Sequence, residues 1–276
     1  MLFGAHNTKA ERKGVMSRSF FRLAAFVTVM VPAVASAQIN FEKSQYYVAM
    51  GDSVAAGEGA MPVTNGYAYQ LYDHGVFAPM QVMDFANVSV RGGRSWELRD
   101  NQVAEVLCST PAQRPTVVTI TAGANDFFRG DTDIFGIALR VTESINLLLN
   151  NGTPYVLTPV LDPVTQTPCA PLTNVTILVS NYYHIPVPVP QVNAIVDSAL
   201  SGFDQAMRAL LPFVYVPAGS KLGYVDLYGA SADRQGLVLI ERRLGFSGPF
   251  DWEPHPTNLG HTFIAGEFAK VFQSLQ

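Results

Sequence analysis

The stretch YYVAMGDSVAAGEG, Tyr46 to Gly59, decides the fold class of this chain. Its apolar run Tyr46–Met50 is typical of a buried strand, and the run stops at the turn residues Gly51-Asp52-Ser53. The small residues Val54–Ala60 that follow fit the opening of a helix. A strand, turn and helix in this order predict a parallel α/β sheet with Ser53 at the carboxyl end of a strand, where such sheets bind ligands. This position suits a serine nucleophile and a phosphate cradle equally well.

Further β-rich runs alternate with helical patterns along the rest of the chain. The predicted strands are Phe85–Val90, Thr116–Gly123, Asn174–Tyr183 and Lys221–Gly229. The predicted helices are Tyr67–His74, Trp96–Leu107, Ile134–Asn150, Gln191–Leu211 and Thr262–Leu275. We therefore predict a single three-layer α/β/α domain over residues 38–276 with a five-stranded, mostly parallel sheet.

Two proline-containing segments interrupt this alternation. Residues Thr153–Leu172 hold five prolines and form a predicted connection without regular structure. The segment HIPVPVPQ, His184–Gln191, is predicted to be extended because alternate prolines exclude both a helix and a central strand. Its position after a strand makes it a candidate wall of a substrate cleft, with a plain surface loop as the alternative.

Composition excludes several classes of protein. Of the 276 residues, 48% are hydrophobic and 14% charged, which favours a packed globular protein over a disordered one. The net charge of −4 and the scattered arginines argue against a partner made of nucleic acid. The first turn has neither the spacing of a dinucleotide-binding motif nor that of a P-loop, so a nucleotide-binding function is disfavoured.

The amino-terminal residues have the pattern of a secretory signal peptide. Basic residues accompany an apolar run from Phe20 to Val34, and Ala35-Ser36-Ala37 supplies the small residues of a cleavage site. We expect residues 1–37 to be removed, with the mature protein secreted or periplasmic and not inserted in a membrane. An uncleaved membrane anchor is the alternative, although the apolar run after Arg22 is shorter than a full span.

The two cysteines, Cys108 and Cys169, both lie in the mature part of the chain. An even number of cysteines in an exported protein predicts a disulfide between them. No histidine and carboxylate residues have the spacing of metal ligands, so we predict no metal and no cofactor.

Four segments at strand ends or in loops carry the residues with chemical potential: Ser53, Gly92, Asn125 and His255. They occur in the motifs GDSVAAGEG, NVSVRGG, Gly123-Ala124-Asn125-Asp126 and His255-Pro256-Thr257. Together these motifs resemble the SGNH subgroup of the GDSL esterase/lipase family, in the same order and across the mature chain. The resemblance implies a flavodoxin-like hydrolase fold and the cleavage of carboxylic esters.

The resemblance also implies a role for each of these residues. Ser53 is the expected nucleophile, and His255 is the expected base, because an imidazole can accept the serine proton at neutral pH. The backbone N–H groups of Ser53 and Gly92 and the side-chain amide of Asn125 are the expected oxyanion hole. Asp126 is expected to have a scaffolding role.

The acid that would orient His255 is less well defined. The family usually has an aspartate three residues before the histidine, but Trp252 occupies that position here. We favour Asp251 as the acid, with Glu253 as the alternative. A backbone carbonyl that orients His255 without either acid is a third possibility.

The predicted function is therefore that of a secreted serine esterase or lipase that uses a Ser53 acyl-enzyme. The substrate is a small-molecule, lipid or carbohydrate ester, and its acyl and alcohol parts stay open. A polysaccharide or peptidoglycan O-acetylesterase would use the same site. A non-catalytic secreted binding module on a degenerate hydrolase fold is the alternative of another class, and the displaced acid is its main support.

Overall fold

The computed structural model describes residues 45–108, 115–187, 189–232 and 254–276. The predicted signal peptide lies outside these residues. The same holds for the two candidate acids Asp251 and Glu253, so both remain predictions.

A five-stranded sheet forms the centre of the described fold. Its strands are β1 (Gln45–Gly51), β2 (Val82–Asn87), β3 (Val117–Thr121), β4 (Thr176–Ser180) and β5 (Lys221–Val225). The strand order is β2-β1-β3-β4-β5, and every neighbouring pair is parallel. This order is the flavodoxin-like one, and it confirms the predicted α/β class. Its switch point, where such folds bind ligands, lies between β1 and β3.

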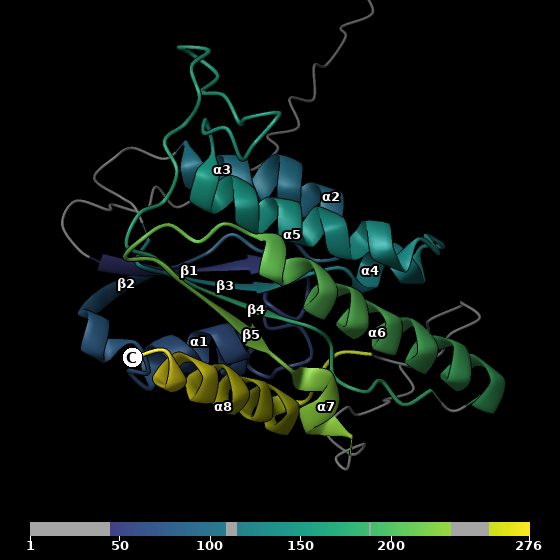
Figure 1. Ribbon diagram of the computed structural model, residues 1–276. Coiled ribbons are helices and arrows are strands. Elements are labelled where there is room, and N and C mark those ends of the chain that lie inside the picture. Colours follow the sequence, from purple (N-terminus) through teal and green to yellow (C-terminus); the bar gives the residue numbers. More distant parts are fainter. Residues whose placement is uncertain (1–44, 109–114, 188, 233–253) are drawn as a thin grey trace, which may run out of the picture. The chain divides into compact units, whose positions relative to one another are not determined.

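Helices cover both faces of the sheet (Figure 1). One face carries α1 (Tyr67–Asp73) and α8 (Asn258–Ser274), which pack against each other. The other face carries α5 (Ile134–Asn150), with which α2 (Ser95–Glu97), α3 (Val103–Leu107) and α6 (Pro190–Leu210) are in contact. Short helices α4 (Ala124–Phe128) and α7 (Leu227–Ser231) follow strands β3 and β5. The predicted three-layer arrangement is confirmed.

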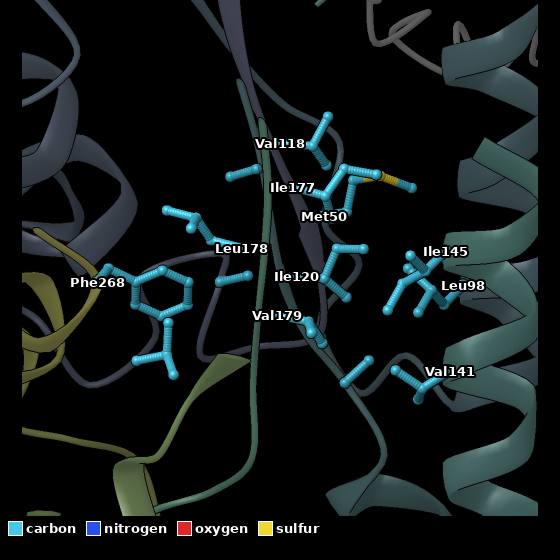
Figure 2. Packing of buried hydrophobic residues seen from close by; sticks show 14 of the residues in the cluster. Met50, Leu98, Val118, Ile120, Val141, Ile145, Ile177, Leu178, Val179 and Phe268 are labelled. Atoms are coloured by element: carbon cyan, nitrogen blue, oxygen red, sulfur yellow. The ribbon is translucent and has the colours of Figure 1, made fainter. Parts of the chain in front are cut away.

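Successive side chains of a strand point to opposite faces of the sheet, so the buried strands contribute to a hydrophobic core on each face (Figure 2). Side chains such as Met50, Ile120 and Val179 extend toward α5, where they meet Val141 and Ile145 on the helix. The neighbouring residue Leu178 extends to the opposite face, toward Phe268 of α8. Strands β3 and β4 are buried along their whole length, as expected for the centre of a parallel sheet.

Several local predictions were wrong. Residues Val54–Ala60 form hydrogen-bonded turns instead of a helix, because Gly57 and Gly59 adopt positive φ angles of 84° and 90° that interrupt the helical path. The predicted helix Trp96–Leu107 is divided into α2, a π-helical segment over Leu98–Gln102 and α3. Strand β2 begins and ends three residues before the predicted Phe85–Val90.

Cys108 and Cys169 form a disulfide that joins the end of α3 to the proline-containing connection. Their Cα atoms are 5.3 Å apart, which is within the usual range for such a bond. Within the parts of the chain that the structure describes, no helix combines the length and apolar character needed to cross a membrane.

Candidate active site

Three turns meet at the carboxyl edge of the sheet beside β1. The turn after β1 carries Ser53, and α4 begins directly after β3 with Asn125 in its first turn. The turn after β2 joins them, because the Val90 N–H donates to the carbonyl of Gly51 at 3.0 Å. Parallel strands end at the same edge, so residues far apart in the sequence converge at the switch point.

The distance between Ser53 and His255 is the central feature of this edge. Nε2 of His255 lies 2.7 Å from Oγ of Ser53, within hydrogen-bond distance, although 202 positions separate the two residues. His255 is held in place from both sides. The Tyr183 hydroxyl donates to the Pro254 carbonyl at 2.9 Å, and Thr257 caps the amino terminus of α8 by accepting the Gly260 N–H.

Two backbone N–H groups at this edge are available as donors. Among the residues that the structure describes, neither the N–H of Ser53 nor that of Gly92 has a hydrogen-bond partner. Gly92 has a φ of 69°, and a Cβ at this position would lie 2.8 Å from Nη2 of Arg129. The left-handed φ favours glycine at position 92, whereas the flexible end of the Arg129 side chain could move away from a Cβ.

The side-chain amide of Asn125 lies between the other two turns. Its Nδ2 donates to the Gly93 carbonyl at 3.1 Å and to Oδ2 of Asp52 at 3.4 Å. The amide thus connects the turn after β2 with the turn that carries Ser53. Asn125 therefore contacts the residues next to Gly92 and Ser53, namely Gly93 and Asp52.

Asp52 is a buried carboxylate directly before Ser53, with 1% of its surface exposed. It accepts hydrogen bonds from the Tyr182 hydroxyl and from the Val54 N–H, the latter at 3.0 Å. Burial raises the pKa of Asp52 from its ordinary 3.8 to about 6, although these two hydrogen bonds oppose the rise. The sequence motif placed Asp52 in a turn but gave no sign of its link to Tyr182.

A pocket opens above the serine. It is lined by the polar residues Asp52, Ser53, Asn125 and His255, and by Val54, Ala124, Phe128, Tyr182, Tyr183, Ile185 and Pro254. Ile185 belongs to the proline-rich segment His184–Gln191, so this segment contributes to the cleft wall. The described residues contain no group of three or more histidine, cysteine or acidic side chains that could hold a metal ion.

A different carboxylate lies near His255 among the described residues. Oε2 of Glu58 is 3.6 Å from Nε2 of His255, the same nitrogen that faces Ser53. Glu58 therefore does not occupy the place of the third triad member, which would face Nδ1. Sequence reasoning did not identify Glu58, because only the packing of two distant segments brings it to the histidine.

Asp126 and His261 support the site from behind. Asp126 accepts the Ser95 N–H at 2.7 Å and the Ser95 hydroxyl at 2.8 Å, in line with the predicted scaffolding role. His261 is completely buried in α8 and joins the start of α1 to the turn after β1, since Nδ1 accepts the Tyr67 N–H and Nε2 donates to the Glu58 carbonyl. Burial lowers the pKa of His261 from 6.5 to about 4, so the ring is neutral at pH 7.

The sequence matches a known family over most of its length. The family model of the GDSL-like lipase/acylhydrolases matches residues 47–268, which include all four motifs. The chain belongs to the GDSL-like lipase/acylhydrolase family. It is accordingly a carboxylic ester hydrolase, as predicted. No curated protein sequence matches the chain at a significant level.

Solved structures share the fold of this GDSL-like hydrolase at low sequence identity. A serine-to-alanine mutant of an acetyl esterase with an acetate ion matches with a TM-score of 0.53 and 15% identity, over 84% of this chain and 98% of the other. A G-D-S-L family lipolytic protein from Veillonella parvula matches with a TM-score of 0.52 and 14% identity, over 83% of this chain and 99% of the other. LAE5, an alpha/beta hydrolase from the metagenome of Lake Arreo, matches with a TM-score of 0.52 and 16% identity, over 86% of this chain and 99% of the other.

Proposed function

We propose that this GDSL-like hydrolase is an exported serine esterase in which Ser53 is the nucleophile and His255 the general base. The 2.7 Å contact between Ser53 Oγ and His255 Nε2 carries the proposal. A serine hydroxyl needs an adjacent base to attack a carbonyl at neutral pH, and this distance suits the proton transfer. The leader sequence supports export.

In the acylation step, Ser53 Oγ attacks the ester carbonyl carbon while its proton moves to Nε2 of His255. The carbonyl oxygen becomes negatively charged and is stabilised by N–H groups of Ser53, Gly92 and Asn125. When the intermediate collapses, the bond between the carbonyl carbon and the alcohol oxygen breaks, and Nε2 returns the proton to the departing alcohol. Water then cleaves the acyl-enzyme by the same sequence of proton transfers.

The free donors at this edge support the oxyanion assignment. The unpaired N–H groups of Ser53 and Gly92, free among the described residues, lose no internal hydrogen bond when they bind an oxyanion. The Asn125 amide has a weak contact with Asp52 at 3.4 Å, which an oxyanion can replace. Donors already in place need little rearrangement as the charge develops.

The orientation of His255 is proposed to come from Asp251, with Glu253 as the alternative acid and a backbone carbonyl as the third possibility. Separate Asp251→Asn and Glu253→Gln variants distinguish them. The acid that supports His255 is the one whose removal lowers kcat by more than about 100-fold. Retained activity in both variants supports the backbone carbonyl.

Hydrolysis of 4-nitrophenyl esters of increasing acyl length tests the central proposal. We expect activity in the mature protein, a loss of about 1,000-fold or more in Ser53→Ala, and no loss in the control Ser274→Ala on the exposed side of α8. A preference for acetate would support the O-acetylesterase alternative, which acetylated glycans then test directly. A folded protein without activity on any ester would support the binding-module alternative.

A further inference from the structure

Glu58 is held next to the reacting edge of His255. Its Oε2 lies 3.6 Å from Nε2, and its side chain is 26% exposed while that of His255 is 18% exposed. Among the described residues, no lysine or arginine lies within 4.0 Å of the Glu58 carboxylate. The charge of Glu58 is therefore not neutralised by a described cation, and it is partly screened from solvent.

The backbone on both sides of this carboxylate is fixed by hydrogen bonds. The Glu58 N–H donates to the carbonyl of Ser53 at 2.9 Å, and the Glu58 carbonyl accepts Nε2–H of His261 at 2.9 Å. The His261 tautomer is set in turn, because Nδ1 accepts the Tyr67 N–H at 3.1 Å. A buried histidine and the nucleophile's own loop thus determine where Glu58 lies.

Gly59 allows this loop to touch the histidine segment. With a φ of 90°, a Cβ at position 59 would lie 2.8 Å from Cβ of His255 and 2.4 Å from the carbonyl oxygen of Pro256. No other residue fits in that space without displacing backbone. The Glu58 carboxylate, next to Gly59, is therefore kept close to His255 because the segment around Gly59 packs directly against the segment around His255.

Nε2 of His255 is also the atom that the departing alcohol must approach. In the acylation step described above, Nε2 donates its proton to the alcohol oxygen, which requires a distance of about 3 Å between them. Since Glu58 Oε2 is 3.6 Å from the same nitrogen, the alcohol oxygen lies no more than about 7 Å from the carboxylate. Asp52 also lines the pocket beside Ser53. It adds a second negative charge of the same sign, so the Glu58→Gln variant measures the share that belongs to Glu58.

We infer that Glu58 is a specificity-determining residue whose negative charge favours esters with a cationic alcohol part and disfavours those with an anionic one. The inference rests on the proposed function, because it requires the alcohol to leave through Nε2 of His255. The charge acts at close range in a partly buried site, where electrostatic interactions are stronger than in bulk water.

A pair of esters with equal shape and different charge tests the inference. The substrates are 3-(trimethylammonio)phenyl acetate and 3-tert-butylphenyl acetate, and the measured quantity is the ratio of their kcat/KM values. Comparing the ratio between variants cancels the difference in intrinsic reactivity. We expect Glu58→Gln to lower the cation-to-neutral ratio about threefold to tenfold, with a smaller change in kcat/KM for the neutral ester.

Glu143→Gln is the matched control, since Glu143 lies in α5 and pairs with Arg99. It removes the same charge from the protein and should leave the ratio unchanged. An unchanged ratio in Glu58→Gln, with both esters slowed equally, would limit Glu58 to a structural role and overturn the inference alone. Ester hydrolysis that persists in Ser53→Ala, or no hydrolysis in the wild type, would overturn the proposed function and the inference with it.

Discussion

Two buried aspartates follow the central strands β1 and β3, and they differ in their partners. Asp52 and Asp126 are each 1% exposed. Asp126 pairs with a cation, Arg140, whose Nη2 lies 3.4 Å away, and it also accepts two hydrogen bonds from Ser95. Asp52 accepts hydrogen bonds only from neutral groups among the described residues, namely Tyr182, Val54 and Asn125.

The difference separates a framework residue from a site residue. Asp126 connects α4 to α2 and α5 through Ser95 and Arg140, so its charge is compensated and its role is to hold helices together. Asp52 has no described cation, its pKa is raised to about 6, and its donors include the Asn125 amide of the proposed oxyanion hole. The same residue type thus supports stability after one strand and positions the site after the other.

Removing the charge of each aspartate should produce the largest contrast. We expect Asp126→Asn to lower the free energy of unfolding at pH 7 by about 3 kcal/mol, because it leaves Arg140 without one of its two carboxylates. Asp52→Asn should leave the stability at pH 7 unchanged or higher, because it removes a buried charge that no cation among the described residues compensates. Urea unfolding at pH 7 measures both, and equal losses would contradict the comparison.

The pH dependence of stability sharpens the contrast. The folded pKa of Asp52, about 6, exceeds its ordinary 3.8, so the folded state binds the proton more tightly. The stability that this group contributes is present below pH 3.8 and is lost as the pH rises through 6. Asp52→Asn should remove this loss, so the stability difference between variant and wild type should grow by about 3 kcal/mol from pH 3.8 to 6.

The contribution of His261 to stability depends on pH in the opposite direction, over nearly the same pH range as that of Asp52. Its folded pKa of about 4 is below the ordinary 6.5, so its contribution is present above pH 6.5 and is lost as the pH falls toward 4. Between pH 4 and 6 the two residues should nearly cancel, each with a slope of about 1.4 kcal/mol per pH unit. Unfolding of His261→Gln across this range should expose the Asp52 slope, and a variant that parallels the wild type would contradict the assignment.

Removing the donor from Tyr182 should have the smallest effect of the series. Tyr182→Phe deletes the hydroxyl that donates to Asp52, which should loosen the Asp52–Asn125 contact and lower kcat by about fivefold, corresponding to roughly 1 kcal/mol. The control is Tyr47→Phe, which deletes a buried hydroxyl bonded to Thr119 in the core. Steady-state kinetics on a 4-nitrophenyl ester compare the two, and an equal loss in both variants would argue for a general packing effect.

The sheet and most of its helices could be predicted because their patterns are local. Buried parallel strands appear as short apolar runs, and Ile134–Asn150 was predicted with the bounds of α5. The turns after Met50 could not be distinguished from a helix in the sequence, because small residues fit both structures. The positive φ angles of Gly57 and Gly59, which exclude the helix, appear only in the folded chain.

The candidate site was predictable where motifs mark it and not where packing creates it. Ser53, Gly92, Asn125 and His255 stand in recognisable motifs, and the structure brings the motifs together at one edge. The contacts of Asp52 with Tyr182 and of Glu58 with His255 join segments far apart in the sequence, and no periodicity or spacing signals them. Burial and charge compensation, which separate Asp52 from Asp126, likewise exist only in the folded chain.

Covalent labelling tests the central claim, the reactivity of Ser53, most directly. A 4-nitrophenyl alkylphosphonate reacts with an activated serine and releases 4-nitrophenol, and peptide mass spectrometry locates the adduct. The account predicts a single adduct on Ser53 in the wild type, a much slower reaction in His255→Ala, and none in Ser53→Ala. Labelling at another residue, or no labelling of the folded wild-type protein, would contradict it.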